Sequence, residues 1–303
     1  MIANIYTIIS PLSDDYYLSG GHTTGRDLID ALKIAGYYVN VITPNDQFQD
    51  PETADLCVFF DLFNDPSNSK WFGSLEQRKF LNTKIPTVVF ECAYTGATPE
   101  DYGGWRLSDG DRYQPNVIKT FMSALMSNSF ANIFLSPLHY NEWCRFIGGI
   151  IPNGFNYFQK VNHKIFHNTE SERPINILYV GAITEAKGVV EAQYMFGDNI
   201  KFIGRGDLSL IDPANYIGVG KPEEVAKAMN AAKFFLHLPN WKEASARTVV
   251  EAAMCGCRLL VNENVGACSF GFADIQNPNH GIDSFNQMTK ILQERKINVK
   301  HEK

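Results

Sequence analysis

Two acidic residues, Glu243 and Glu251, have seven residues between them and are the strongest candidates for chemistry in this sequence. Glu243 lies in the expected loop after an apolar strand, and Glu251 lies in an Ala-rich helix that ends at Gly256. A carboxylate can accept hydrogen bonds from two vicinal hydroxyls, as a ribose or a hexose offers them. An E-x7-E pair also arises by chance, but this context favours a pair that binds a hydroxylated ligand.

The expected start of this helix lies between the two acids, with Ser245 as its N-cap. The first turn of a helix has backbone N–H groups without intrahelical partners, and these groups can bind an anion. The amides concerned belong to Ala246, Arg247 and Thr248.

A second candidate segment, Y-V-G-A-I-T-E-A-K-G, runs from Tyr179 to Gly188. A strand is expected to end at Gly181 and a helix to begin near Thr184, so that the turn between them presents N–H groups to an anion. Lys187 adds a mobile positive charge. Many strand–turn–helix units carry a lysine, so by itself this segment fits an ordinary turn as well as an anion site.

Paired glycines, Gly20 and Gly21, follow the first expected strand. They allow a backbone to approach a ligand closely, and the helix start after them suits a phosphate. The segment does not read G-x-G-x-x-G, so the dinucleotide fingerprint is absent. A plain turn into the first helix is the alternative.

The loop over residues 94–114 is long for a compact domain, which is typical of a functional segment. It carries aromatic residues and carboxylates, among them Tyr94, Trp105 and Asp109. Such a surface suits a sugar or a cationic molecule. The alternative is a packed surface loop whose aromatic side chains fill local gaps.

Strands and helices are expected to alternate along the chain, which predicts βαβ units and parallel sheets. The expected strands cover residues 3–9, 38–43, 56–60, 86–90, 133–136, 150–152, 175–180, 201–203, 234–238 and 258–261. The expected helices cover residues 24–35, 74–82, 116–127, 137–146, 184–195, 223–232, 245–255 and 284–295.

A polar segment over residues 156–175 interrupts this alternation and is interpreted as the crossing between two domains. We therefore predict an α/β chain of two Rossmann-like domains that face each other across a cleft. The first domain would cover residues 1–158 and the second residues 159–283. A final helix, 284–303, could pack back on the first domain.

The composition limits the classes of function. Of the 303 residues, 45% are hydrophobic and 20% are charged, so the chain is not mostly disordered. The net charge of −6 argues against a general binder of nucleic acid or anionic membranes. Residues 1–155 hold 10 Lys+Arg against 17 Asp+Glu, a net of −7, and residues 156–303 hold 17 against 16, a net of +1. This asymmetry favours an anionic ligand in the second half.

No run approaches the ~20 apolar residues of a transmembrane helix, and the first residues lack the basic region of a secretory signal. The six cysteines are scattered, with no Cys/His set at zinc spacing. We therefore expect reduced thiols, no metal site and a cytoplasmic protein.

Taken together, these segments resemble the retaining GT-B glycosyltransferases of the glycogen-synthase and sucrose-synthase-like group (glycosyl transferases group 1). The parallels run in chain order and cover most of the sequence. They are the glycine pair Gly20–Gly21, the P-N-G at 152–154, the Y-V-G…K-G at 179–188, the I-G-R-G-D at 203–207 and the E-x7-E segment.

This resemblance implies that Lys187 binds the donor diphosphate, that Glu251 holds the nucleotide ribose, and that Glu243 lies close to the donor sugar. It gives catalytic roles to Glu243 and Lys187. It also makes domain 1–158 the acceptor side and domain 159–283 the one that binds the nucleotide sugar. It also implies that no metal is needed, because cationic side chains and helix dipoles stabilise the leaving diphosphate. The donor contacts it implies are Gly20, Gly21, Gly181, Arg205, Ser245, Ala246, Arg247, Thr248 and Glu251.

The sequence departs from the family pattern in two places. The arginine of the family's G-R segment is Ala182 here, and Arg205 or Arg247 could replace its charge. The family's cleft histidine is absent after the fourth strand, where Glu91 or Tyr94 could take its role. With Trp105 and Asp109, these two residues form the expected acceptor side.

The predicted function is transfer of a sugar, with retention, from a nucleotide-diphosphate sugar to a soluble saccharide or small hydroxylated molecule, without a cofactor. One alternative is a nucleotide- or glycan-binding relative that has lost catalysis. Another is an enzyme that glycosylates modified DNA bases, which the acidic first half disfavours.

Overall fold

The computed structural model describes residues 1–7, 20–43, 46, 48–61, 79–92 and 115–301. The chain divides into two compact units. Unit 1 comprises Met1–Gln159 with Ile282–Lys303, and unit 2 comprises Lys160–Gly281.

Unit 1 is built on a six-stranded parallel sheet in the order β2-β1-β3-β4-β5-β6. Its strands are short and mostly buried, which explains their nearly continuous apolar sequences. The strands are β1 (Ile2–Thr7), β2 (Tyr38–Ile42), β3 (Leu56–Phe60), β4 (Thr87–Phe90), β5 (Ala131–Phe134) and β6 (Gly154–Asn156).

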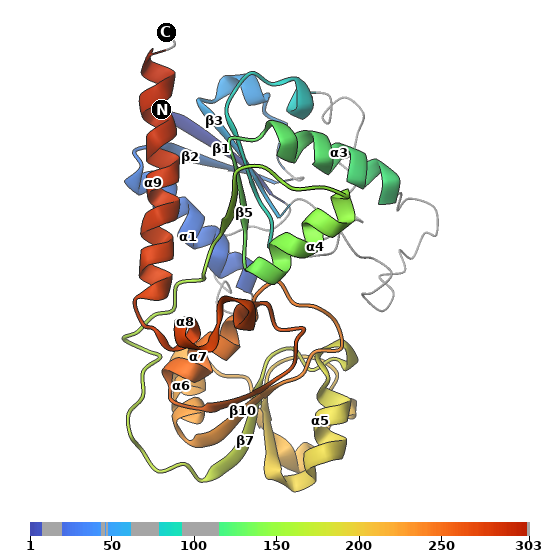
Figure 1. Cartoon of the computed structure of the whole chain (residues 1–303). Coiled ribbons are helices and arrows are strands. Elements are labelled where there is room, and N and C mark those ends of the chain that lie inside the picture. Colours follow the sequence, from blue (N-terminus) through green and yellow to red (C-terminus); the bar gives the residue numbers. More distant parts are fainter. Residues whose placement is uncertain (8–19, 44–45, 47, 62–78, 93–114, 302–303) are drawn as a thin grey trace. The chain divides into compact units, whose positions relative to one another are not determined.

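Helices cover both faces of this sheet, with α1 (Gly20–Ile34) and α9 (His280–His301) on one side and α3 (Pro115–Asn128) and α4 (Pro137–Ile147) on the other (Figure 1). Met288 and Leu292 of α9 are fully buried. On the opposite face, Trp143 of α4 is fully buried in the cluster that also holds Tyr6 and Phe59. The sheet is therefore the middle layer of three.

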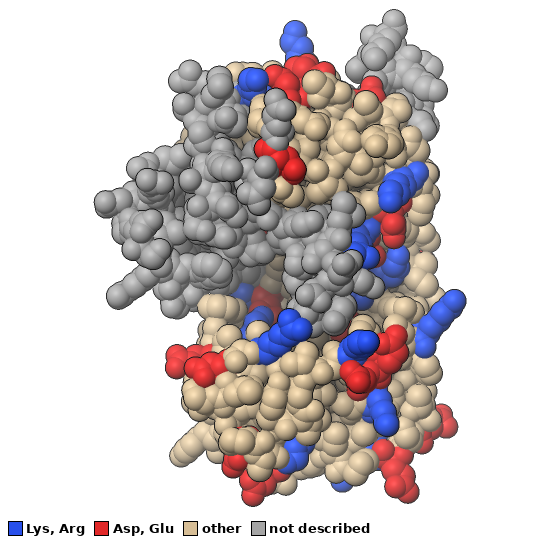
Figure 2. Space-filling view, turned by 180° about the vertical axis from the view of Figure 1, so that it is seen from behind, with Lys and Arg blue, Asp and Glu red and all other residues tan. Residues whose placement is uncertain are grey.

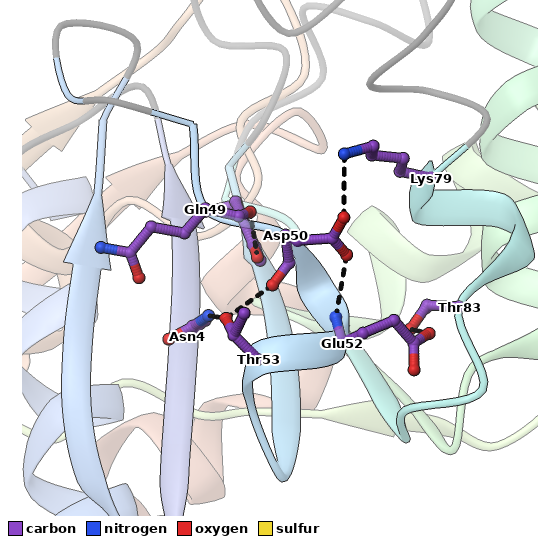
Figure 3. A network of polar contacts seen from close by, with 8 residues as sticks. Asn4, Gln49, Asp50, Glu52, Thr53, Lys79 and Thr83 are labelled. Carbon is purple, nitrogen blue, oxygen red and sulfur yellow. Dashed lines mark hydrogen bonds and ion pairs between the residues drawn. The ribbon is translucent and has the colours of Figure 1, made fainter.

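A polar network fixes the chain where it enters β3 and β4 (Figure 3). Asp50 caps a short 3₁₀ turn, accepting the N–H of Glu52, and pairs with Lys79 at 2.8 Å. Glu52 in turn accepts the hydroxyl of Thr83 at 2.8 Å. The Lys79–Asp50 pair is well exposed to solvent, so it contributes little stability.

Unit 2 has a five-stranded parallel sheet in the order β11-β10-β7-β8-β9. Its strands are β7 (Ile175–Val180), β8 (Ile200–Ile203), β9 (Tyr216–Gly218), β10 (Ala232–His237) and β11 (Arg258–Val261). Its helices are α5 (Val189–Phe196), α6 (Pro222–Asn230), α7 (Arg247–Met254) and α8 (Phe272–Gln276). The chain leaves β7 for β8 and β9 on one side and returns to β10 on the other, so the topological switch lies between β7 and β10.

The two parallel sheets with covering helices confirm the predicted α/β class with two Rossmann-like folds. One expected strand is wrong: residues 150–152 are not in the sheet, and β6 begins at Gly154. Ile150 is exposed, and Asn153 turns the backbone with a φ of 52° before the strand begins. The short edge strand β9 was not anticipated.

Candidate active site

The residues selected from the second half of the sequence lie around the switch point of the unit 2 sheet. Gly181 directly follows β7, and the loop that carries Glu243 follows β10. In open parallel sheets, ligands bind outside the carboxyl ends of the strands at such a switch. The topology therefore places Glu243 where a ligand of unit 2 is expected.

Backbone pairing holds Glu243 in this position. Its N–H donates to the carbonyl of Asn264 at 2.7 Å, and its carbonyl accepts the N–H of Gly266 at 3.0 Å. Ala267 donates to the carbonyl of Ser245 at 2.6 Å. A Cβ at Gly266 would overlap the carbonyl oxygen of Glu243, so the close approach of these two segments requires glycine.

A second glycine positions Lys187. Gly188 has a φ of 72°, and a Cβ there would overlap the carbonyl oxygen of Leu238, the residue that follows β10. Nearby, Asn240 donates its backbone N–H to the carbonyl of Ala186 at 2.9 Å. Lys187 is therefore held beside the end of β10, although 56 residues separate it from Glu243.

The carboxylate of Glu243 lies between two basic side chains. Lys187 Nζ is 2.6 Å from Oε1, and His237 Nε2 is 3.1 Å from Oε2. The first contact is a charged hydrogen bond, and the second is a contact of polar groups outside hydrogen-bond geometry. Glu243 and His237 are buried, whereas 26% of the Lys187 side chain is exposed.

These neighbours control the protonation of Glu243. Burial by itself raises the pKa of this carboxyl, because the charged form loses hydration, but the charges of His237 and Lys187 outweigh burial and lower the pKa to about 2. Glu243 is therefore ionised at neutral pH. It can accept hydroxyl groups or stabilise a developing positive charge, but it cannot act there as a general acid.

The second acid, Glu251, pairs with an arginine on its own helix. Arg247 Nε donates to Glu251 Oε1 at 2.8 Å, with an i, i+4 spacing along α7. Burial raises the pKa of Glu251, and the charge and hydrogen bond of Arg247 oppose the rise only in part. The two acids of the E-x7-E segment therefore have opposite pKa shifts.

The expected starts of two helices are corrected by the structure. Ser245 is not the N-cap of α7, which begins at Arg247 after Ala246. Ala246 has a φ of 70°, and this left-handed turn delays the helix, while Ser245 is buried and Thr248 half-buried. The helix expected from residue 184 instead starts at Val189, after a 3₁₀ turn over Glu185–Lys187.

The I-G-R-G-D segment packs against the loop that follows β7. Gly204 and Gly206 have φ values of 154° and 145°, and a Cβ on either would overlap the carbonyl oxygen of Gly181 or Ile183. The N–H of Ile183 donates to the carbonyl of Arg205 at 2.7 Å, and the side chain of Arg205 is exposed. The structure thus brings Arg205 next to the segment that carries Gly181.

The remaining candidates belong to unit 1. Gly20 and Gly21 begin α1, and Glu91 follows β4 with its side chain buried. Tyr94, Trp105 and Asp109 lie outside the described residues.

Two residues of interest were missed by sequence reasoning. Asp61 follows β3, is fully buried and has a φ of 49°. Burial, together with the charges of Asp61 and Glu91, raises the pKa of the Cys92 thiol well above its usual value, so these two acids lie near each other at one sheet edge. The other residue is His237. In both cases the available signal was a polar residue at the carboxyl end of an apolar strand.

Among the residues described, no three His, Cys, Asp or Glu side chains are grouped so as to hold a metal ion. In the same part of the chain, no helix combines the length and the apolar character needed to cross a membrane.

Solved structures with the same architecture include a sucrose-phosphate synthase from Thermosynechococcus elongatus, with a TM-score of 0.63 and 15% identity over 97% of this chain and 93% of that one. The chain has the GT-B fold. Anabaena HepE in complex with UDP and glucose is similar over 97% of this chain and 94% of that one, with a TM-score of 0.56 and 12% identity. A glycosyltransferase from Rickettsia africae is similar over 98% of this chain and 93% of that one, with a TM-score of 0.58 and 11% identity. No protein-family model and no curated protein matches the chain. The resemblance inferred from the sequence is confirmed at the level of the GT-B fold.

Proposed function

We propose that this protein is a glycosyltransferase that binds a nucleotide-diphosphate sugar at the carboxyl edge of β7 and β10. The observation that carries the proposal is the group of Lys187, Glu243 and His237 at the switch point of a GT-B unit. A buried carboxylate that is kept ionised suits the hydroxyls of a sugar, and the partly exposed lysine beside it suits a diphosphate.

Each charged group has a distinct proposed task. Lys187 neutralises the charge that develops on the leaving diphosphate, and its three N–H groups allow it to contact more than one acceptor. Glu243 accepts hydroxyls of the donor sugar. Glu251 accepts the hydroxyls of the ribose. Arg205, exposed beside Gly181, supplies the second cation in place of the family's arginine, which is Ala182 in this sequence.

The donor, acceptor and stereochemistry complete the proposal. HepE has been solved in complex with UDP and with UDP-glucose, so uridine donors are the first to test. We propose transfer with retention, without a metal, in the cytoplasm, to a neutral or cationic hydroxylated molecule. The charges fit this acceptor class better than nucleic acid. Residues 1–155 carry a net −7, and on the face in Figure 2 basic and acidic side chains are interspersed.

A second candidate function is binding of a nucleotide or glycan without transfer. Ala182 favours it, because this exposed residue stands where the resembling family has an arginine. Slow hydrolysis of the donor in the absence of an acceptor would separate an enzyme from a binding protein.

The donor site can be tested by calorimetry and thermal shift with UDP-, GDP-, ADP- and dTDP-sugars. A ligand at about 100 times its Kd should stabilise the protein by roughly 2.7 kcal/mol. Lys187→Ala should weaken binding of the nucleoside diphosphate but hardly that of the free nucleoside. Lys79→Ala is the matched control, because Lys79 also forms a 2.8 Å pair with a carboxylate, but in unit 1.

The outcomes are distinct. Loss of diphosphate binding in Lys187→Ala, with Lys79→Ala unchanged, supports the assignment. Equal losses for nucleoside and nucleoside diphosphate would contradict it. If none of the donors stabilises the wild-type protein, the proposed function is wrong. Retention is tested separately, by determining the anomeric configuration of the first product by NMR.

A further inference from the structure

His237 ends strand β10 in an environment that is unusual for a polar ring. Only 3% of the residue is exposed. Its ring stacks with Tyr179 at 6.0 Å and 22° and with Phe235 at 6.5 Å and 25°. A phenyl ring can also stack on aromatic neighbours, so stacking alone does not require an imidazole here.

The ring nitrogens of His237 have one charged neighbour that the structure shows, the carboxylate of Glu243. Neither ring nitrogen has a hydrogen-bond partner among the described residues, and Nε2 lies 3.1 Å from Oε2 of Glu243. A buried polar group lowers stability unless it is paired. The benefit of a histidine here therefore has to come from Glu243.

Glu243 needs such a contact because its other partner has a second task. In this structure, Lys187 binds Oε1 at 2.6 Å. Under the proposed function, the diphosphate of the donor attracts the same ammonium group. If Lys187 turns to the diphosphate, a buried carboxylate loses a counter-charge, which is costly.

We propose that His237 is a positioning residue: it holds Oε2 of Glu243, so that Lys187 can turn from Oε1 to the donor diphosphate. This inference rests on the proposed function. The contact at Oε2 falls outside hydrogen-bond geometry while Lys187 holds Oε1. A small rotation of the carboxylate on release of Lys187 would complete the bond, as catalytic hydrogen bonds commonly tighten in the substrate complex.

The test uses two variants of His237 in two backgrounds. His237→Phe keeps an aromatic ring between Tyr179 and Phe235 but removes the N–H, whereas His237→Gln keeps a donor. Each is made in the wild-type protein and in Glu243→Gln, and the probe is whichever of UDP, GDP and ADP the wild type binds most tightly. Affinity is measured by calorimetry, turnover with the matching donor sugar, and folding by thermal denaturation.

In the wild-type background, His237→Phe should weaken diphosphate binding about five- to tenfold, because Glu243 then keeps hold of Lys187. In Glu243→Gln the same change should cost less than about twofold, because no charge is left to compete for Lys187. Turnover should fall about 10- to 100-fold in His237→Phe, as expected when a reacting group is misplaced, and His237→Gln should recover part of it.

Equal losses of affinity in both backgrounds, or wild-type affinity and turnover in His237→Phe, would overturn the proposal. The proposal would also be overturned if His237→Phe and His237→Gln lost turnover equally and both unfolded at a lower temperature than the wild type, since His237 would then serve only packing. If the wild-type protein binds none of the three nucleotides, the proposed function itself fails, and the inference with it.

Discussion

The opposite pKa shifts of the two glutamates predict opposite effects of acid on stability. The pKa of Glu243 is lowered from 4.5 to about 2 in the folded protein. Stability from such a group is fully present above its unfolded pKa and is lost as the pH falls towards the folded pKa. Glu243→Gln removes this dependence, so the difference in unfolding free energy between wild type and variant should shrink on acidification.

The magnitude follows from the fall of the Glu243 pKa from 4.5 to about 2. At 1.36 kcal/mol per unit, the ionised form of Glu243 contributes about 3 kcal/mol at neutral pH. Linkage between the two pKa values leaves about 1 kcal/mol of this at about pH 3. The gap between wild type and Glu243→Gln should therefore narrow by about 2 kcal/mol between about pH 7 and pH 3.

Hydrogen exchange of the backbone amides in β7 and β10 measures this difference for unit 2 alone, with wild type and variant compared at the same pH. Glu251→Gln is the matched control, because burial raises the pKa of Glu251. Protonation of a group with a raised pKa favours the folded state. The unfolding free energy of the wild type minus that of Glu251→Gln should therefore rise as the pH falls, whereas the same difference for Glu243→Gln should fall. A constant gap for Glu243→Gln, or the same trend in both variants, would refute the reasoning.

Further predictions concern the backbone and the ligands. Ala246→Gly should stabilise unit 2 by about 1 kcal/mol in hydrogen exchange, because Ala246 has a φ of 70°, and a loss would contradict this. Gly188→Ala should destabilise the same unit by about 3 kcal/mol, because its Cβ would overlap a backbone oxygen. Hydrogen-exchange rates in this variant equal to those of the wild type would contradict the prediction. Glu251→Gln should weaken nucleotide binding in calorimetry about ten- to a hundredfold, since a charged hydrogen bond contributes about 1.5–3 kcal/mol, and unchanged affinity would exclude a ribose contact. Replacing Trp105 and Asp109 by Ala should raise the acceptor KM in steady-state kinetics without changing donor affinity. A loss of donor affinity in this variant would indicate instead that the loop contacts the donor.

The fold was predictable because its strands are short apolar runs separated by helical patterns. Strands β3, β7 and β11 have the expected bounds, since each is a compact apolar segment followed by a turn signal. The errors occur where one residue's backbone conformation overrides the pattern. Asn153 and Ala246 both have positive φ values, which a pattern of apolar residues does not reveal.

The candidate site was predictable in part. The spacing of Glu243 and Glu251 and the segment before Gly188 were visible in the sequence. The Lys187–Glu243 contact spans 56 residues and depends on the strand order β10-β7, so local patterns could not show it. His237 was missed because one polar residue ends an otherwise apolar strand, and this signal becomes informative only when its neighbour Glu243 is known.

The energetics of the unit 2 cluster favour a functional origin over a stabilising one. A buried ion pair is weak evidence for stability, because removing two charges from water costs about as much as their attraction returns. Here a carboxylate, an ammonium and an imidazole converge, and strict backbone requirements at Gly188 and Gly266 are needed to bring their segments together. The pair in unit 1, Lys79–Asp50, reaches a similar distance at a well-exposed position. An arrangement that costs desolvation and backbone freedom, and that lies at the switch point of a parallel sheet, is best explained by a ligand that recovers the cost on binding.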